Sequence, residues 1–329
     1  MSQRHSSLTE PGSPGLSLVH EHGRSLRVSF NGTGIFRYVY GPWDPQFESP
    51  RPYFHPLTTL GGKEVSTYRP HDHLWHKGMA WSLPNVGTEN FWGGPTYNRG
   101  RGYQQLENNG STNHIEFTSL EVSPERITVV ENLEWITQAG ELWVREERRF
   151  GVEVIGAGEH GEAAWALTYA TNFTNVSGAD IVMGSPTTQG RENAGYGGLF
   201  WRGPRSFTGG SVYIPGRQGG DDLNGVRAPW MAFSGQHDGE GGASTLVFVD
   251  SPNNSYPGGE NTEWFVRTGI FAVVSPSPYY STELTFEPGQ SLSYEYAVVI
   301  ADEDRGVDGS GDLAAASLQL LGSPAAAGR

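Results

Sequence analysis

The sequence predicts an all-β fold, an antiparallel β-sandwich. Its 329 residues include 46 Gly and 21 Pro, which suit many tight turns, and 12% of the residues are aromatic. Short runs rich in β-branched and aromatic residues follow one another with no amphipathic helix between them. Parallel strands need long, mostly helical crossovers, so this pattern favours antiparallel strands in a sandwich or barrel.

The expected strands recur along the whole chain. In the first half they cover residues 16–20, 25–30, 35–40, 115–122, 127–137 and 141–153, and in the second half 163–175, 179–187, 211–214, 244–249, 271–274 and 291–301. Residues 312–321 alone favour a helix. We therefore predict one sandwich domain over residues 15–311, followed by a short C-terminal helix and tail at 312–329.

The first 14 residues are rich in Ser, Pro and Gly, and we predict a disordered leader there. Two internal segments, 41–113 and 187–243, are dense in Gly, Pro, Trp and Asn and poor in expected strands. Connections this long in a compact domain usually build a site. These segments also hold five of the ten histidines, so we expect both to line one face of the sandwich.

The charge and composition exclude several classes of partner. Lys and Arg total 22 and Asp and Glu total 36, a formal charge of -14 that disfavours nucleic acid. A sugar is compatible with this charge, because 10 Trp and 14 Tyr offer flat faces for its C–H groups. The chain has no Cys, no apolar N-terminal segment and no run near the roughly 18 residues that span a bilayer. We expect a cytoplasmic protein with a small-molecule carbohydrate partner and no membrane association; the pattern does not indicate an oligomeric state.

The stretch "YRPHDHLWHKGMAW" at residues 68–81 concentrates titratable side chains. Imidazoles titrate near neutral pH, so a pair of them can give and take protons in one turnover, and we predict His73 and His76 as catalytic residues. This stretch, the preceding "RPYFHPL" and the later "NFWGG" supply the predicted substrate-binding residues Arg51, Tyr53, His55, Asp72, Lys77, Trp81 and Trp92.

A metal site is the alternative for the same histidines, with His71, His73 and His76 as candidate ligands. Three imidazoles suit zinc, copper or iron. The spacing lacks the helical His-Glu-x-x-His register, however, and no acidic ligand stands at a diagnostic distance. We therefore favour proton transfer with no required cofactor and keep a divalent metal as the second possibility.

Two further segments supply the remaining candidates. In "TTQGRENAGYGGLFWRG" we choose Glu192 as the catalytic carboxylate and Arg191 as a substrate ligand, although the glycines there are equally typical of a β-turn. In "DSPNNSYPGGENTEWFVR" we predict Asn254 and Arg267 as substrate ligands. The alternating strip "ELWVREERRF" contains Glu147, the next candidate carboxylate, but such strips are usually solvated faces.

The motifs "RPYFHPL", "HDHLWHKGMAW", "NFWGG" and "GYGGLFWRG" resemble those of the bacterial family labelled "methane oxygenase PmoA", over residues 51–301. Here Trp75 stands where that family often has a His, and Lys77 where it has an Arg. A methane monooxygenase subunit is an integral membrane protein, so the resemblance does not imply methane oxidation. It implies a galactose-mutarotase-like supersandwich, in which a His and a carboxylate on a broad concave sheet act on sugars.

The resemblance further implies proton-transfer chemistry in sugar catabolism. The substrate would be a sugar or an oxidised, 3-keto type sugar, and the enzyme a lyase, hydrolase or epimerase with His73 or His76 as the acid and Glu192 as the base. A ketone acidifies the adjacent C–H, so a modest base suffices. The alternative from another class is a non-catalytic carbohydrate-binding protein, which would need Arg51, Trp81 and Trp92 but no clustered histidines.

Overall fold

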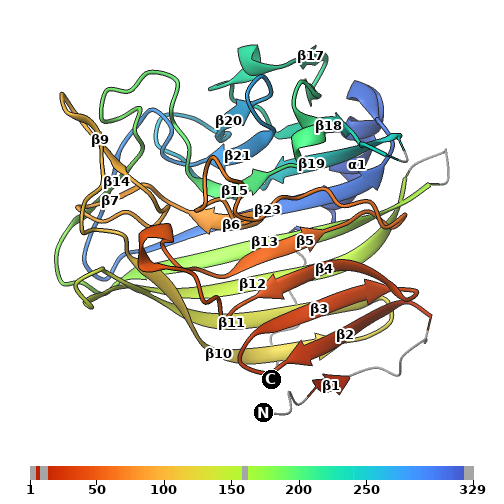
Figure 1. The fold of residues 1–329 in the computed structure, drawn as a ribbon, viewed down its shortest axis with the longest axis horizontal. Helices are drawn as coiled ribbons and strands as arrows, with labels where there is room; N and C mark the ends of the chain where they lie inside the picture. The colour runs from red at the N-terminus through yellow and green to blue at the C-terminus, as the bar shows by residue number, and fades with distance from the viewer. Residues whose placement is uncertain (1–4, 8–13, 158–161, 240, 322–329) are drawn as a thin grey trace.

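Two nine-stranded antiparallel sheets pack face to face (Figure 1). The computed structural model describes residues 5–7, 14–157, 162–239 and 241–321. Every strand pair among the described residues is antiparallel, and neither sheet closes into a barrel. The predicted antiparallel β-sandwich is confirmed.

The first sheet combines the N-terminal strands with three strands from later in the chain. Across the sheet the order is β1 (His5–Ser7), β2 (Leu16–Glu21), β3 (Ser25–Phe30), β4 (Thr33–Val39), β5 (Tyr53–Leu57), β6 (Met79–Ser82), β15 (Gly198–Arg202), β21 (Val273–Ser277) and β20 (Glu263–Arg267).

The second sheet contains the longest strands. Its order is β10 (Ser111–Val122), β11 (Arg126–Ile136), β12 (Leu142–Ala157), β13 (Glu162–Asn175), β23 (Ser291–Asp302), β19 (Ala243–Asp250), β18 (Trp230–Gln236), β16 (Ser211–Ile214) and β17 (Arg217–Gly219). In β12, the exposed Arg145, Glu147 and Arg149 alternate with the buried Glu146, Arg148 and Phe150, as the period of two for side chains in a strand requires.

Smaller elements complete the fold. They are a three-stranded sheet of β22 (Leu284–Phe286), β14 (Ile181–Gly184) and β7 (Asn85–Val86), a hairpin of β8 (Thr96–Asn98) and β9 (Gly102–Gln104), the single-turn helices η1 (Gln46–Glu48), η3 (Arg205–Phe207) and η4 (Asp221–Leu223), and the helix α1 (Gly306–Leu318). No helix among the described residues has the length and apolar character needed to cross a bilayer.

The main core lies between the two large sheets. Its largest fully buried side chains are Trp135 and Trp165 of the second sheet and Trp201 and Trp264 of the first. Helix α1 covers part of the outer face of the second sheet, where Leu313 and Ala314 pack on small and β-branched residues of β13, β19 and β23.

Most expected strands are present within a few residues of their predicted bounds. The two long segments, however, contain more strands than expected. Residues 41–113 contain β5 to β9, and residues 187–243 contain β15 to β18. These strands are at most seven residues long, which explains why the alternation did not reveal them. The C-terminal helix begins six residues before the predicted 312–321. Of the predicted leader, His5–Ser7 pair with β2, and residues 1–4 and 8–13 lie outside the described residues.

The alternation within β15 separates the core from a second apolar layer. Leu199 and Trp201 point into the core, whereas Phe200 belongs to a cluster on the outer face of the first sheet with Trp92, Phe265, Val273 and Tyr280. Loops from residues 41–113 and 187–197 cover this face. The candidate site lies between these loops and the sheet.

Candidate functional site

A cavity of about 470 Å³ lies on the outer face of the first sheet. It is lined by His73, Trp75, His76, Trp92, Gly93, Pro95, Tyr103, Arg191, Tyr196, Phe200, Phe265, Arg267, Ile270 and Phe271. Both long segments contribute, and the connection between β20 and β21 supplies the last two residues. Parts of both segments therefore meet at one face, as predicted, whereas β16 to β18 of the second segment lie in the other sheet.

The sequence "NFWGG" shapes the wall beside Trp75. Gly93 has φ +100°, and a Cβ there would lie 2.6 Å from the carbonyl oxygen of Glu48 and from Cβ of Trp75. Only glycine permits this backbone conformation and this close approach without strain. Trp92 is thereby held at the cavity with 5% of its surface exposed.

Arg51 fixes the loop that carries His73 and His76. Its guanidinium donates to the carbonyl oxygens of Glu48 (3.0 Å), Ser49 (2.8 Å) and Trp75 (2.7 Å). Burial lowers the pKa of Arg51 to about 10, with Asp44 and Glu48 opposing the shift. The predicted ligand Arg51 thus supports the loop and does not line the cavity.

Asp72, Arg202 and His73 form a charged group at the edge of the cavity. Arg202 donates to both oxygens of Asp72, at 3.3 and 3.0 Å, and Nδ1 of His73 lies 3.2 Å from Oδ2 of Asp72. Burial raises the pKa of Asp72, but the hydrogen bonds and charge of Arg202 outweigh it and bring that pKa to about 2. Burial also lowers the pKa of His73, and the nearby Asp72 offsets only part of this. Asp72 is therefore ionised, and His73 is neutral at neutral pH.

His76 is fixed in one tautomer. It is 2% exposed, and its Nδ1 lies 3.2 Å from Nη1 of Arg202. A guanidinium can only donate, so Nδ1 must accept and the ring proton must reside on Nε2. Burial, together with the neighbouring His73 and the positive charges of Arg202, Arg51 and Lys77, holds the pKa of His76 well below its usual value. His76 is a neutral hydrogen-bond donor.

The two imidazoles are stacked, with centroids 4.6 Å apart and planes 13° from parallel. The carboxylate of Asp72, 3.2 Å from Nδ1 of His73, favours the tautomer with the proton on Nδ1, although the two groups are not aligned as a hydrogen bond, and in that tautomer Nε2 carries the free lone pair. His73 is then a base, while His76 presents an N–H. The pair combines a proton acceptor with a hydrogen-bond donor on one wall.

Two guanidinium groups complete the lining. Arg191 lies over the ring of Tyr103, 4.9 Å from its centroid, and hydrogen-bonds to its hydroxyl. Arg267 lies over Phe265, at 4.8 Å, and donates to the carbonyl oxygens of Val266 and Asn193. Both residues were predicted as ligands, and both line the cavity.

Three predicted ligands belong to a neighbouring polar cluster of the first sheet instead. Tyr53 and His55 both stack on the ring of Tyr68. Nδ1 of His55 also lies 2.9 Å from the hydroxyl oxygen of Ser66. Lys77 is fully buried in ion pairs with Asp44 (3.1 Å) and Glu48. These residues stabilise the sheet face and do not line the cavity.

Three further predicted site residues, Trp81, Asn254 and Glu192, also lie outside the cavity lining. Trp81 points into the inter-sheet core and stacks on Tyr169. Asn254 is held by Asp250 and the backbone of Glu295, and it lines a different hollow beside the second sheet. Glu192 is exposed on its loop and does not line the cavity, so the structure does not bring the expected carboxylate to the histidines.

The candidate metal ligands do not converge. His71 is exposed and contacts Arg205, a cation that opposes metal binding. Among the described residues, no group of three or more His, Asp or Glu side chains is placed to hold a metal ion.

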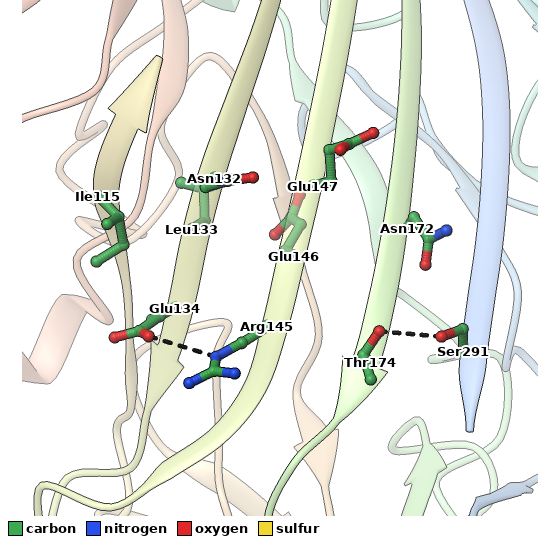
Figure 2. A pocket seen from close by; sticks show the side chains of 10 residues that line it. All are labelled: Ile115, Asn132, Leu133, Glu134, Arg145, Glu146, Glu147, Asn172, Thr174 and Ser291. Carbon is green, nitrogen blue, oxygen red and sulfur yellow. Dashed lines mark hydrogen bonds and ion pairs between the residues drawn. The ribbon is translucent and has the colours of Figure 1, made fainter. Parts of the chain in front are cut away.

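The carboxylate on the open sheet face, Glu147, is also remote from the histidines. Figure 2 shows it in a hollow of about 480 Å³ on the outer face of the second sheet. Arg145 in the same hollow pairs with Glu134 at 3.6 Å, and Thr174 hydrogen-bonds to Ser291 at 2.9 Å. No histidine lines this hollow. Its ladder of polar residues matches the solvated face that the alternation indicated.

The residues that sequence reasoning missed include Arg202, Tyr103, Tyr196, Phe200, Phe265 and Phe271. One signal was present: in "GGLFWRG", alternation places Phe200 and Arg202 on the face opposite Trp201. The remaining aromatics come from loops, where no periodicity reports which way a side chain points.

These features define an all-β sandwich with an aromatic, imidazole-bearing cavity on one outer sheet face. The chain belongs to the family described as "Family of unknown function (DUF6807)", whose model matches residues 25–313. That description carries no methane-oxygenase label, so the label expected from the motifs is not supported. Comparison with curated proteins gives no match.

Two solved structures of sugar enzymes are similar to the chain at low identity. One is a galactose 1-epimerase from Lactobacillus acidophilus, with a TM-score of 0.41 and 8% identity over 92% of this chain and 100% of that one. The other is a family GH36 alpha-galactosidase from Geobacillus stearothermophilus in complex with raffinose, with a TM-score of 0.39 and 11% identity over 93% of this chain. This chain spans 42% of the length of the galactosidase.

Proposed function

We propose that this protein is an enzyme that moves a proton at a carbon next to a carbonyl group of a sugar. The observation that carries the proposal is the stacked pair of His73 and His76, whose ring nitrogens receive opposite roles from Asp72 and Arg202. An acceptor and a donor side by side are what enolisation requires.

In the proposed step, Nε2 of His73 takes the proton from the carbon next to the carbonyl. The electron pair of that C–H bond moves toward the carbonyl carbon, and the carbonyl oxygen becomes an enolate oxygen. Nε2–H of His76 donates to this oxygen as its negative charge develops. Because His76 is buried and neutral, its donor is preorganised at little cost in reorganisation.

The enolate has two outcomes that need no reactant other than water. Departure of a substituent from the next carbon, whose oxygen receives the proton that His73 has accepted, gives an unsaturated sugar, whereas delivery of a proton from water to the opposite face gives an epimer. Addition of water across the new double bond would then complete a hydrolysis. We favour elimination, because His73 can both take the carbon-bound proton and return it to the departing oxygen.

Support for a sugar comes from the walls of the cavity. Trp75, Trp92 and Tyr196 offer flat apolar faces. The charged or titratable groups beside them are few, chiefly the two imidazoles and two guanidinium groups of the lining. A volume of about 470 Å³ is in the usual range for a small-molecule site. Sugar C–H groups stack on aromatic rings, while the carbonyl oxygen requires a donor such as His76.

The direct test is exchange of carbon-bound hydrogen with solvent. Aldoses, ketoses and 3-keto glycosides are incubated with the protein in D₂O, and loss of the proton next to the carbonyl is followed by NMR. We expect catalysed exchange with at least one carbonyl sugar, its loss in His73→Gln, and parental rates in His71→Gln. Sugars that bind without any exchange would instead indicate a non-catalytic binding protein.

The proposed chemistry uses no metal, and two measurements address that point. We expect EDTA to leave exchange unchanged, and elemental analysis of protein purified without a metal affinity step to give less than stoichiometric zinc, manganese or iron. Stoichiometric metal that is lost together with activity in His73→Gln would make the histidines ligands.

A further inference from the structure

We infer that the substrate carries an oxyanion, a carboxylate or a phosphate, held by Arg191 and Arg267. This inference rests on the proposed function only in treating the cavity as the substrate site. It narrows the substrate class from sugars in general to acidic or phosphorylated sugars.

The charge of the cavity differs in sign from that of the chain. The protein carries a formal charge of -14, yet the described lining contains the guanidinium groups of Arg191 and Arg267 and no Asp or Glu. A concave site with apolar walls focuses the field of its own charges. An anion is therefore attracted here, although the molecule as a whole repels it.

Neither guanidinium is neutralised by the protein. Among the described residues, no carboxylate lies within ion-pair distance of Arg191 or Arg267, whereas Arg69, Arg202 and Arg227 each have one. The two groups instead rest on the aromatic faces of Tyr103 and Phe265 and donate only to uncharged oxygens. Each guanidinium has five N–H donors, so each retains donors for a ligand.

The surroundings hold these donors in place before a ligand arrives. The hydroxyl of Tyr103 is fixed by a 2.9 Å contact with that of Tyr196, and Arg267 is anchored by two carbonyl oxygens. A planar guanidinium matches the two oxygens of a carboxylate or phosphate. Little side-chain entropy is then lost on binding.

A purely structural role for Arg267 is the competing explanation, because its contact with Asn193 ties the loop at residues 187–197 to β20. Glutamine separates the two roles: Arg267→Gln keeps an N–H donor for the carbonyl oxygen and removes the charge. Arg99 supplies a matched control, since it is exposed and donates to the carbonyl oxygen of Thr188 (2.7 Å) in the same loop without lining the cavity.

The experiment measures binding, so it does not depend on turnover. Full-length protein is titrated calorimetrically with D-glucuronate and D-galacturonate, with their neutral methyl esters, with glucose 6-phosphate and galactose 6-phosphate, and with glucose and galactose. We expect at least one acid or phosphate to bind at least about tenfold more tightly than its neutral counterpart. Preference for the uronates identifies a carboxylate ligand, and preference for the sugar phosphates identifies a phosphate.

The variants then assign the effect to residues. The double variant R191Q/R267Q should lose the preference for the anion, while Arg99→Gln and His71→Gln, which alter exposed residues outside the cavity lining, keep it. Equal binding of the charged and neutral members, no binding by any anion in the panel, or an unchanged preference in the double variant would each overturn the inference. If the anions bind as expected but no carbonyl sugar exchanges its proton, the anion site at Arg191 and Arg267 is supported and the proposed reaction is wrong.

Discussion

Nη1 of Arg202 lies 3.2 Å from Nδ1 of His76, deep beneath the cavity. Because a guanidinium has no lone pair to offer, this contact requires an unprotonated Nδ1. The same Arg202 also holds Asp72, which contacts His73. One buried cation thus contacts His76 directly and His73 through Asp72, and it adds to the effect of burial on the pKa of both imidazoles.

The first prediction concerns His73 as the base. His73→Gln should lower kcat by a factor of about 10² to 10⁴ with a small change in KM, because the variant cannot accept the carbon-bound proton. In the parent enzyme kcat/KM should fall toward acid pH, through a pKa below the usual imidazole value of roughly 6.5, since burial lowers the pKa of His73. Steady-state kinetics from pH 4.5 to 8 check both points. An acid limb that persists in the variant would assign it to another group.

The second prediction treats Arg202 as a positioning residue. Arg202→Gln removes the cation that lowers the pKa of both histidines, so the acid limb should move to higher pH. Arg202→Lys keeps a positive charge and should leave the limb nearer its parental position. The pH profile of kcat/KM distinguishes these outcomes from a general loss of folded protein, which would lower the rate equally at every pH.

The third prediction separates Glu192 from the chemistry. Glu192 is exposed and outside the cavity lining, so Glu192→Gln should keep kcat within about twofold of the parent, whereas loss of a general base costs at least about 10². Turnover and KM measured beside those of His73→Gln provide the comparison. A loss as large as that in His73→Gln would restore Glu192 as the base and imply that its loop closes over the substrate.

The fold was largely predictable from the sequence because period-two alternation is a local property. Long strands such as β12 and β13 repeat it many times, and tight turns mark their ends. Short strands such as β6 and β15 are buried on both faces. They therefore show a continuous apolar run, which is ambiguous over four or five residues.

The site was predictable only in part, because a residue type reports chemistry and not direction. His73 and His76 stand out by their density in the sequence, and both line the cavity. Trp81 and Lys77 belong to the same stretch, yet alternation sends Trp81 into the core and ion pairing buries Lys77. The role of Arg202 depends on a contact across 126 residues, which no local pattern contains.

The fourth prediction assigns Lys77 to stability. Its ammonium is fully buried between Asp44 and Glu48. Lys77→Met leaves the buried Asp44 without a cation, while Glu48 keeps Arg69, and should lower the free energy of unfolding by about 3 to 5 kcal/mol, the usual effect of leaving a buried charge without its partner. Arg145→Met breaks the exposed pair with Glu134 and should cost under about 1 kcal/mol. Chemical denaturation of both variants tests the contrast. A Lys77→Met protein of parental stability and raised KM would show that Lys77 binds substrate, as the sequence motif suggested.

The fifth prediction concerns the pH dependence of stability at His55. Burial, aided by Arg37, lowers the pKa of His55 to about 4 in the folded protein, whereas the unfolded chain has the ordinary value of roughly 6.5. Below that ordinary value the unfolded state therefore binds more protons, and the free energy of unfolding decreases as the pH falls. Between pH 7.5 and 5, His55 alone should account for a loss of about 2 kcal/mol. In His55→Gln this share of the loss should disappear, while His71→Gln, which alters an exposed imidazole, should follow the parent. Urea denaturation at pH 7.5, 6 and 5 measures the three slopes, and equal slopes for His55→Gln and the parent would mean that His55 is protonated without cost in the folded state.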